Sequence, residues 1–204
     1  MIRLLEAGRT KVYNFIEMEL TSRFEQALVY TTRLHTNQRR KSTDVPYISH
    51  LLSTAALVLE FGGDEDEAIA ALLHDAVEDQ GGLPILDEIR GKFGVRVAHI
   101  VEECTDAFTT PKPPWLNRKE NYLQRLRDAP LDVRRVSLAD KLHNARSLLA
   151  SLRLEGAQVW QRFKGGREGT LWYYQALAEV FQATGGDEMT DEFSRVVAAI
   201  QVLA

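Results

Sequence analysis

Apolar residues recur three and four positions apart along almost the whole sequence, and this spacing limits the fold more than any other feature. It places apolar side chains on one face of an α-helix, whereas a half-buried strand alternates every second residue. No segment shows a convincing alternation of period two, and no internal repeat is visible. The sequence therefore predicts an all-α fold built as a helical bundle.

Capping residues, prolines and paired glycines mark the expected helix ends. Ser22 and Glu25 have the spacing of a capping box, and Pro46 is suited to the first turn of another helix. Gly62–Gly63 and Gly81–Gly82 each stop a helix. The predicted helices cover roughly 2–18, 22–34, 46–61, 64–80, 84–93, 95–107, 118–129, 130–155, 170–184 and 187–204.

The domain organisation is expected to be simple. The chain has 204 residues, a length that fits one domain. Its clearest loop is 108–117, which contains three prolines, and no linker is long or polar enough to divide the chain. We expect a single domain over residues 1–204, with a peripheral helix at 1–20.

Composition indicates an ordinary globular protein, with 45% hydrophobic and 26% charged residues. Cys104 is the only cysteine, so no intrachain disulfide forms and a reducing compartment is favoured. The first twenty residues lack the apolar block of a signal peptide, and no apolar stretch approaches the ~18 residues of a spanning helix. With a net charge of −4, we expect a cytoplasmic protein without nucleic-acid or membrane partners. Formation of a homo-oligomer is left open.

The segment LLHDAVEDQ places four polar side chains at the end of an apolar helix. On a continuous helix, His74, Asp75, Glu78 and Asp79 border one stripe. Acids at a helix C-terminus oppose its dipole, so they do not stabilise the helix locally. An isolated His–Asp pair is more often a core histidine beside a solvated turn, but a divalent cation would remove the cost of burying these acids.

Two other segments supply partners for this pair. His50 lies 24 positions before His74, a separation that lets the two face each other across an antiparallel helix pair. Asp140 and Asn144 share one face of a later apolar helix. Two histidines and two aspartates form a mixed nitrogen and oxygen set that suits Mn, Fe or Zn better than Ca. Such a metal activates water, and Glu78 and Asp79 would position or deprotonate that water.

The motifs NQRRK, PYISH, ALLHDAVED and SLADKLHNAR occur in an order and at a spacing that resemble the HD-domain hydrolases of the RelA/SpoT alarmone family. The resemblance runs from about residue 24 to residue 150 and is strongest to the small stand-alone hydrolases, which include the metazoan SpoT homologues. It implies an HD-domain helical bundle that removes pyrophosphate from the 3′ position of guanosine 3′,5′-bis(diphosphate) and its triphosphate relative.

The resemblance also implies roles for particular residues. The metal ligands would be His50, His74, Asp75 and Asp140, usually with Mn²⁺, although another divalent transition metal is open. Glu78 and Asp79 would be the catalytic acidic pair that activates water. Arg40 would stack on the base, Lys41 would lie in the same basic stretch, and Asn144 would lie near the nucleoside.

Some positions depart from the family pattern. Asn37 stands where glycine is common, Gln80 stands where threonine is common, and the loop after Lys41 is one residue longer. Because this loop follows Arg40, the identity of the base stays open. The alternatives are an HD phosphohydrolase that acts on an adenosine alarmone, NADPH or a dNTP, and a non-catalytic nucleotide-binding module.

Other conspicuous side chains are interpreted as structural. His35 is expected to pack or to form a loop hydrogen bond, and His99 and His143 are interpreted in the same way. Tyr122 is more often a core residue than part of a pocket mouth. Cys104 has no activating neighbour in the sequence, so a thiol nucleophile is disfavoured.

Overall fold

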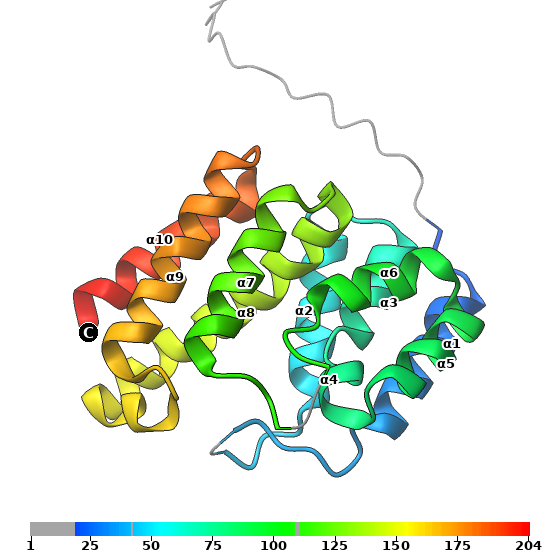
Figure 1. Ribbon diagram of the computed structural model, residues 1–204, viewed down its shortest axis with the longest axis horizontal. Coiled ribbons are helices and arrows are strands. Elements are labelled where there is room, and N and C mark those ends of the chain that lie inside the picture. Colours follow the sequence, from blue (N-terminus) through cyan, green and yellow to red (C-terminus); the bar gives the residue numbers. More distant parts are fainter. Residues whose placement is uncertain (1–18, 42, 109–110) are drawn as a thin grey trace, which may run out of the picture.

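The computed structural model describes residues 19–41, 43–108 and 111–204, and regular structure in these ranges is helical (Figure 1). The helices are α1 (Ser22–Leu34), α2 (Ile48–Glu60), α3 (Glu65–Leu73), α4 (Ala76–Gln80), α5 (Leu83–Phe93), α6 (Val95–Cys104), α7 (Trp115–Asp128), α8 (Leu131–Glu155), the 3₁₀ helix η1 (Gly156–Arg162), α9 (Gly166–Ala183) and α10 (Glu188–Leu203). Extended pairing in these ranges is limited to an isolated bridge between Arg39 and Pro46. The predicted all-α fold is confirmed.

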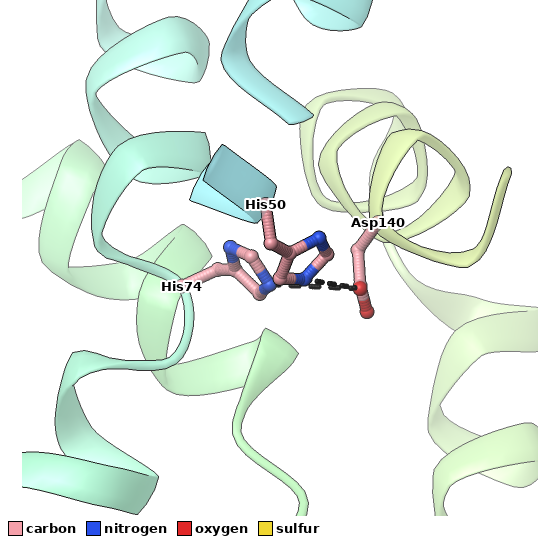
Figure 2. A group of neighbouring side chains, drawn as sticks. All are labelled: His50, His74 and Asp140. Atoms are coloured by element: carbon pink, nitrogen blue, oxygen red, sulfur yellow. Dashed lines mark ion pairs between the residues drawn. The ribbon is translucent and has the colours of Figure 1, made fainter. Parts of the chain in front are cut away.

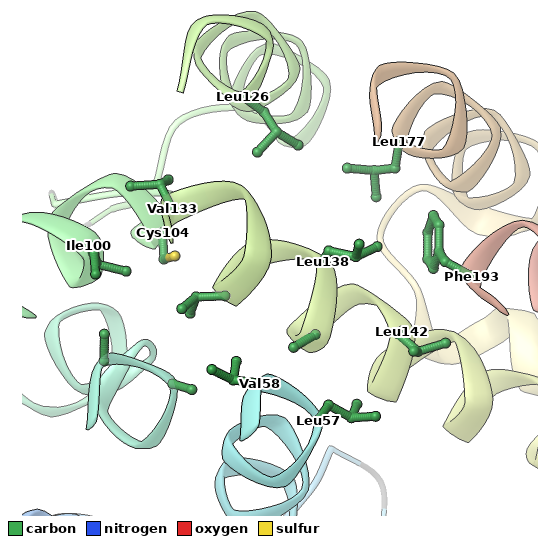
Figure 3. Packing of buried hydrophobic residues seen from close by; sticks show 14 of the residues in the cluster. Leu57, Val58, Ile100, Cys104, Leu126, Val133, Leu138, Leu142, Leu177 and Phe193 are labelled. Carbon is green, nitrogen blue, oxygen red and sulfur yellow. The ribbon is translucent and has the colours of Figure 1, made fainter. Parts of the chain in front are cut away.

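Helix α8 is the longest described helix and lies at the centre of the bundle (Figure 1). It packs against α2, α3 and α6 on one side and against α9 and α10 on the other. Figure 3 shows Leu142 of α8 between Leu57 of α2 and Phe193 of α10, and Leu142 and Phe193 are fully buried. This core fixes the position of α8, and therefore of the polar side chains that it carries.

The predicted helix over 64–80 is wrong in one respect, because the chain forms α3 and α4 with a break at His74 and Asp75. His74 keeps helical dihedral angles, but Asp75 has φ −97° and ψ −3°, outside the α-helical range. The stripe expected on one continuous helix therefore does not exist. The break instead places His74 at the end of α3 and Asp75 at the start of α4.

The helix starts also differ in detail from the prediction. Thr21, not Ser22, is the N-cap of α1, and its hydroxyl accepts a hydrogen bond from the backbone of Arg23. A capping box does form at α3, between Asp64 and Glu67. Pro46 precedes α2 by two residues instead of opening it, because it pairs with Arg39.

The predicted helix over 2–18 lies outside the described residues. The proline-rich loop ends at Pro114, so α7 begins three residues earlier than predicted. In the described ranges, none of the helices is long and apolar enough to cross a membrane.

Candidate metal centre and active site

Three helices bring the predicted metal ligands together (Figure 2). His50 lies in the first turn of α2, His74 at the end of α3, and Asp140 in the middle of α8, and all three are buried. One ligand atom from each lies within 4.8 Å of the other two. His50 Nε2 is 3.2 Å from Asp140 Oδ1, and His74 Nε2 is 3.6 Å from the same oxygen.

Asp75 joins this cluster from the start of α4. Its Oδ2 lies 3.0 Å from His74 Nε2 and 3.6 Å from His50 Nε2. Tyr47 donates a hydrogen bond of 2.6 Å to the same oxygen, which orients the carboxylate. The break between α3 and α4 lets His74 and Asp75 turn toward one point although they are adjacent in sequence.

Hydrogen bonds fix which nitrogen each histidine presents to the cluster. His74 Nδ1 donates to the carbonyl oxygen of Ala71 at 2.8 Å. His50 Nδ1 lies 2.7 Å from His143 Nδ1, and a proton on His50 Nδ1 would be donated across this contact. Each imidazole would then direct an unprotonated Nε2 toward the carboxylates of Asp75 and Asp140. Metal-binding histidines use this arrangement, in which the second ring nitrogen is held by a hydrogen bond.

The donor set fits a divalent cation. His74 Nε2 is buried and makes no hydrogen bond to a described residue, although Asp75 Oδ2 lies 3.0 Å away. Nitrogen lone pairs and carboxylate oxygens that face one another repel unless a cation or a proton lies between them. Burial disfavours a charge on His74, yet Asp75 and Asp140 outweigh this effect and raise its pKa well above the ordinary value. A bound metal would take the place of that proton.

The acidic pair on α4 is held by different partners. Glu78 accepts a hydrogen bond of 2.6 Å from Lys112 Nζ and a weaker one from the backbone N–H of Asp106. Asp79 Oδ2 accepts a hydrogen bond of 2.8 Å from Gln38 Nε2. Burial and the charge of Asp75 raise the pKa of Asp79 to about 6. Asp79 is therefore mostly ionised at neutral pH, with a pKa close enough to 7 for proton transfer.

A hydrogen-bond network behind Asp79 was missed by the sequence interpretation. Gln38 Oε1 accepts a hydrogen bond of 2.7 Å from His35 Nδ1 and one of 2.5 Å from Gln80 Nε2. His35 thus forms the loop hydrogen bond that was expected of it. Gln80, which stands where the family commonly has threonine, belongs to this network because its amide donates to Gln38. The only signal for this network in the sequence was the position of Gln38 beside the basic stretch at residues 39–41.

The predicted substrate-binding residues lie on the side of the cluster formed by α8 and the α1–α2 loop. Arg40 Nη2 donates a hydrogen bond of 2.8 Å to Asn144 Oδ1, and Asn144 in turn donates to Asp140. The Arg40 guanidinium also lies 5.6 Å from the ring centre of Tyr47. Lys41 instead donates to the carbonyl of Arg162 in η1. The structure therefore links Arg40 and Asn144 directly to the cluster and places Lys41 at a contact with η1.

Comparison with known proteins identifies the family of the chain. The profile of a family described as "HD domain" matches residues 27–171. The human protein named guanosine-3′,5′-bis(diphosphate) 3′-pyrophosphohydrolase MESH1 is 39% identical over 126 residues, which cover 60% of this chain and 68% of that protein. The protein of the same name from Xenopus tropicalis is 40% identical over 126 residues, with the same coverage.

Solved structures share the fold. A crystal structure of lmo0812 from Listeria monocytogenes EGD-e is 33% identical with a TM-score of 0.66, covering 74% of this chain and 97% of that one. A metazoan orthologue of SpoT, described as hydrolysing ppGpp, has a TM-score of 0.71 at 24% identity. The match covers 89% of this chain and 97% of that one. At this identity it shows a shared fold and nothing further. The chain belongs to the HD-domain family, in the group that contains the MESH1 3′-pyrophosphohydrolases.

Proposed function

We propose that the chain is a metal-dependent hydrolase that removes the 3′-pyrophosphate of guanosine 3′,5′-bis(diphosphate) and its triphosphate relative. The observation that carries the proposal is the convergence of His50, His74 and Asp140 from three helices onto one point, with Asp75 beside them. The relatives that share this part of the chain bear the name of that activity. We place this reaction in the cytoplasm, with a small nucleotide as the partner.

His50, His74, Asp75 and Asp140 would hold the metal, for which Mn²⁺ is our proposal. When bound, such an ion polarises a phosphoryl group and lowers the pKa of a coordinated water. His143 and Ala71 hold the two histidine rings through their Nδ1 atoms. Tyr47 and Asn144 hold the two carboxylates. These supporting contacts keep the ligand atoms directed at one point before substrate arrives.

Asp79 and Glu78 would handle the attacking water. Asp79, ionised at neutral pH, accepts a proton as the water oxygen bonds to the phosphorus attached to the 3′ oxygen. The bond between that phosphorus and the 3′ oxygen breaks, and the 3′ oxygen gains a proton, giving guanosine diphosphate and pyrophosphate. Glu78, held by Lys112, orients the water beside Asp79.

Arg40, Lys41 and Asn144 would bind the nucleoside side of the substrate. Tyr47 lies beneath Arg40, so the guanidinium has one face on an aromatic ring and its plane is suited to stacking on a base. The hydrogen bond from Arg40 to Asn144 ties this position to the helix that carries Asp140. Recognition of the base is thereby coupled to the position of the reacting phosphate.

The test is a substrate panel. The purified chain is incubated with Mn²⁺ and guanosine or adenosine 3′-diphosphates, dNTPs or NADPH, and the products are identified. Pyrophosphate release from the guanosine 3′-diphosphate supports the proposal, while turnover of dNTPs or NADPH alone would replace it with another phosphohydrolase. Nucleotide binding without turnover would indicate a non-catalytic module.

Asp140→Asn should lose the activity, and Asp132→Asn is its matched control, because Asp132 lies on the same helix in an ion pair with Arg96.

A further inference from the structure

A cluster of mostly buried cations lies beside the candidate metal centre and has no role in the mechanism above. Lys141 Nζ is 2.6 Å from Asp140 Oδ2, the carboxylate oxygen opposite the one that faces the histidines. Lys119 Nζ of α7 is 3.2 Å from Asp106 Oδ2. The side chains of Lys119 and Lys141 are only 18% and 15% exposed.

The charges of this cluster do not balance. Arg118 and Lys119 both pair with the same oxygen of Asp106, so one carboxylate serves two cations. Lys141 pairs with Asp140, but that carboxylate would also be shared with the metal. Burial and the positive charges of Lys141 and Arg118 lower the pKa of Lys119 to about 7, so Lys119 is only partly protonated at neutral pH and a bound anion would favour its charged form. A surplus of buried positive charge is costly unless an anion compensates it.

Two tyrosine rings form the wall of the cluster. Lys119 Nζ lies 4.9 Å from the ring centre of Tyr173, and Lys141 Nζ lies 4.8 Å from that of Tyr122. The hydroxyl of Tyr122 donates to Ser137. The hydroxyl of Tyr173 is buried and has no hydrogen-bond partner among the described residues. Such a hydroxyl costs stability in the free protein and is available to a ligand that accepts a hydrogen bond.

The position of the cluster relates it to the reacting groups. Lys119 is close enough to Glu78 and Asp140 for the negative charges of both acids to oppose part of the lowering of its pKa. Lys141 contacts the metal-ligand candidate Asp140 directly. A diphosphate whose reacting phosphorus lies at the metal would therefore meet ammonium groups on this flank, whereas Arg40 and Asn144 line the nucleoside side.

We propose that Lys119, Lys141 and the hydroxyl of Tyr173 form a subsite for a diphosphate group. This part of the proposal stands on the cluster itself. A second part of the proposal rests on the function proposed above. In that reaction, the subsite holds the 3′-diphosphate, which is released as pyrophosphate. Two ammonium groups and a hydroxyl are donors that suit the non-bridging oxygens of a diphosphate, and a fixed cation there neutralises the negative charge of those oxygens while water attacks the phosphorus.

Lys92 provides a matched control. Its ammonium group also lies over a tyrosine ring, 5.7 Å from the centre of Tyr30, and pairs with Glu88 at 3.6 Å. Its side chain is half exposed and lies on α5. Lys92→Met and Lys119→Met therefore remove the same charge and the same kind of ring contact, but only Lys119→Met changes the proposed subsite.

The experiment measures binding by calorimetry to the Mn²⁺-loaded protein, with pyrophosphate added as its equimolar Mn²⁺ complex so that it does not remove the metal. Guanosine diphosphate, added in the same way, reports the 5′-diphosphate and the base. Lys119→Met should weaken pyrophosphate binding about tenfold or more, as expected for a lost charged hydrogen bond. Tyr173→Phe, which keeps the ring packing, should weaken it severalfold. Lys92→Met should leave it unchanged, and neither subsite variant should change guanosine diphosphate binding more than about twofold.

Unchanged pyrophosphate binding in both subsite variants, with thermal unfolding showing that they are folded, would overturn the proposal. Equal losses for pyrophosphate and guanosine diphosphate would overturn the assignment to the 3′-diphosphate. The experiment measures binding and not turnover. It therefore tests whether the subsite binds a diphosphate even if guanosine 3′,5′-bis(diphosphate) is not a substrate. Failure of the proposed function and failure of the subsite are therefore separate results.

Discussion

Replacing His143 by alanine should weaken metal binding, although His143 is not itself a ligand candidate. In the structure its Nδ1 lies 2.7 Å from Nδ1 of His50, whose side chain is 1% exposed. Burial, His50 and Arg40 lower the pKa of His143 to about 4, so the ring is neutral near pH 7 and its Nδ1 can accept a hydrogen bond from His50 Nδ1. With a metal on His50 Nε2, the proton of His50 lies on Nδ1 and is donated in this hydrogen bond to His143.

The size of the effect follows from what remains after the substitution. Loss of such an outer contact costs about 10–100-fold in metal affinity, and a buried donor without a partner costs about 1–3 kcal/mol. Thr54 Oγ1 lies 3.5 Å from His50 Nδ1 and can rotate toward it, so the loss should fall near the lower end of this range. We expect His143→Ala to bind Mn²⁺ about tenfold more weakly than the unsubstituted chain.

The assay is competition for Mn²⁺ between the protein and a metal-sensitive dye at constant pH. His99→Ala is the control, because His99 is exposed on α6 and lies outside the site. His143→Asn should recover much of the affinity, since its side-chain oxygen can accept the same proton. An affinity for His143→Ala within twofold of the unsubstituted chain, or an equal loss in His99→Ala, would refute the reasoning.

Three further predictions follow from the same contacts. Activity should rise with pH through about pH 6, because burial and Asp75 raise the pKa of Asp79 to about 6 and only the carboxylate accepts a proton; a flat profile of kcat/KM would contradict this. Gln38→Leu removes a hydrogen bond that lowers the pKa of Asp79, so the same rise should move to higher pH, and an unmoved profile would count against it. Leu142→Ala should lower the free energy of unfolding by about 2–5 kcal/mol in urea titrations, because Leu142 is fully buried, and a loss below about 1 kcal/mol would show that the core closes over the space.

Most of the fold was predictable because helix periodicity is a local property of the sequence. The helices after Gly82 and around the central α8 follow the apolar spacing and the glycines and prolines that bound them. The break between α3 and α4 was not predictable in this way. The sequence from Leu72 to Val77 contains neither glycine nor proline, and its residues are compatible with a continuous helix. The break reflects the tertiary positions of His74 and Asp75, which face partners on α2 and α8.

The metal-ligand part of the candidate site was predictable, because residue type and spacing along the sequence both point to it. His50, His74 and Asp140 are residue types that bind metals, and each lies in a helix whose position follows from the pattern. The contact between Gln38 and Asp79 joins residues 41 positions apart, and that between Lys41 and Arg162 joins residues 121 positions apart. Both involve the loop between α1 and α2, which meets α4 and η1 only in the folded chain, and a loop carries no periodic signal. Without the coordinates, their partners could not be assigned.

The central claim is that one metal ion, held by His50, His74, Asp75 and Asp140, is required for release of pyrophosphate from guanosine 3′,5′-bis(diphosphate). The most direct measurement adds Mn²⁺ back to chelator-treated protein and follows bound metal and released pyrophosphate together. We predict that pyrophosphate release rises in proportion to one bound ion per chain and that Asp140→Asn shows neither. Full activity in the metal-free protein, or release of orthophosphate instead of pyrophosphate, would contradict the account.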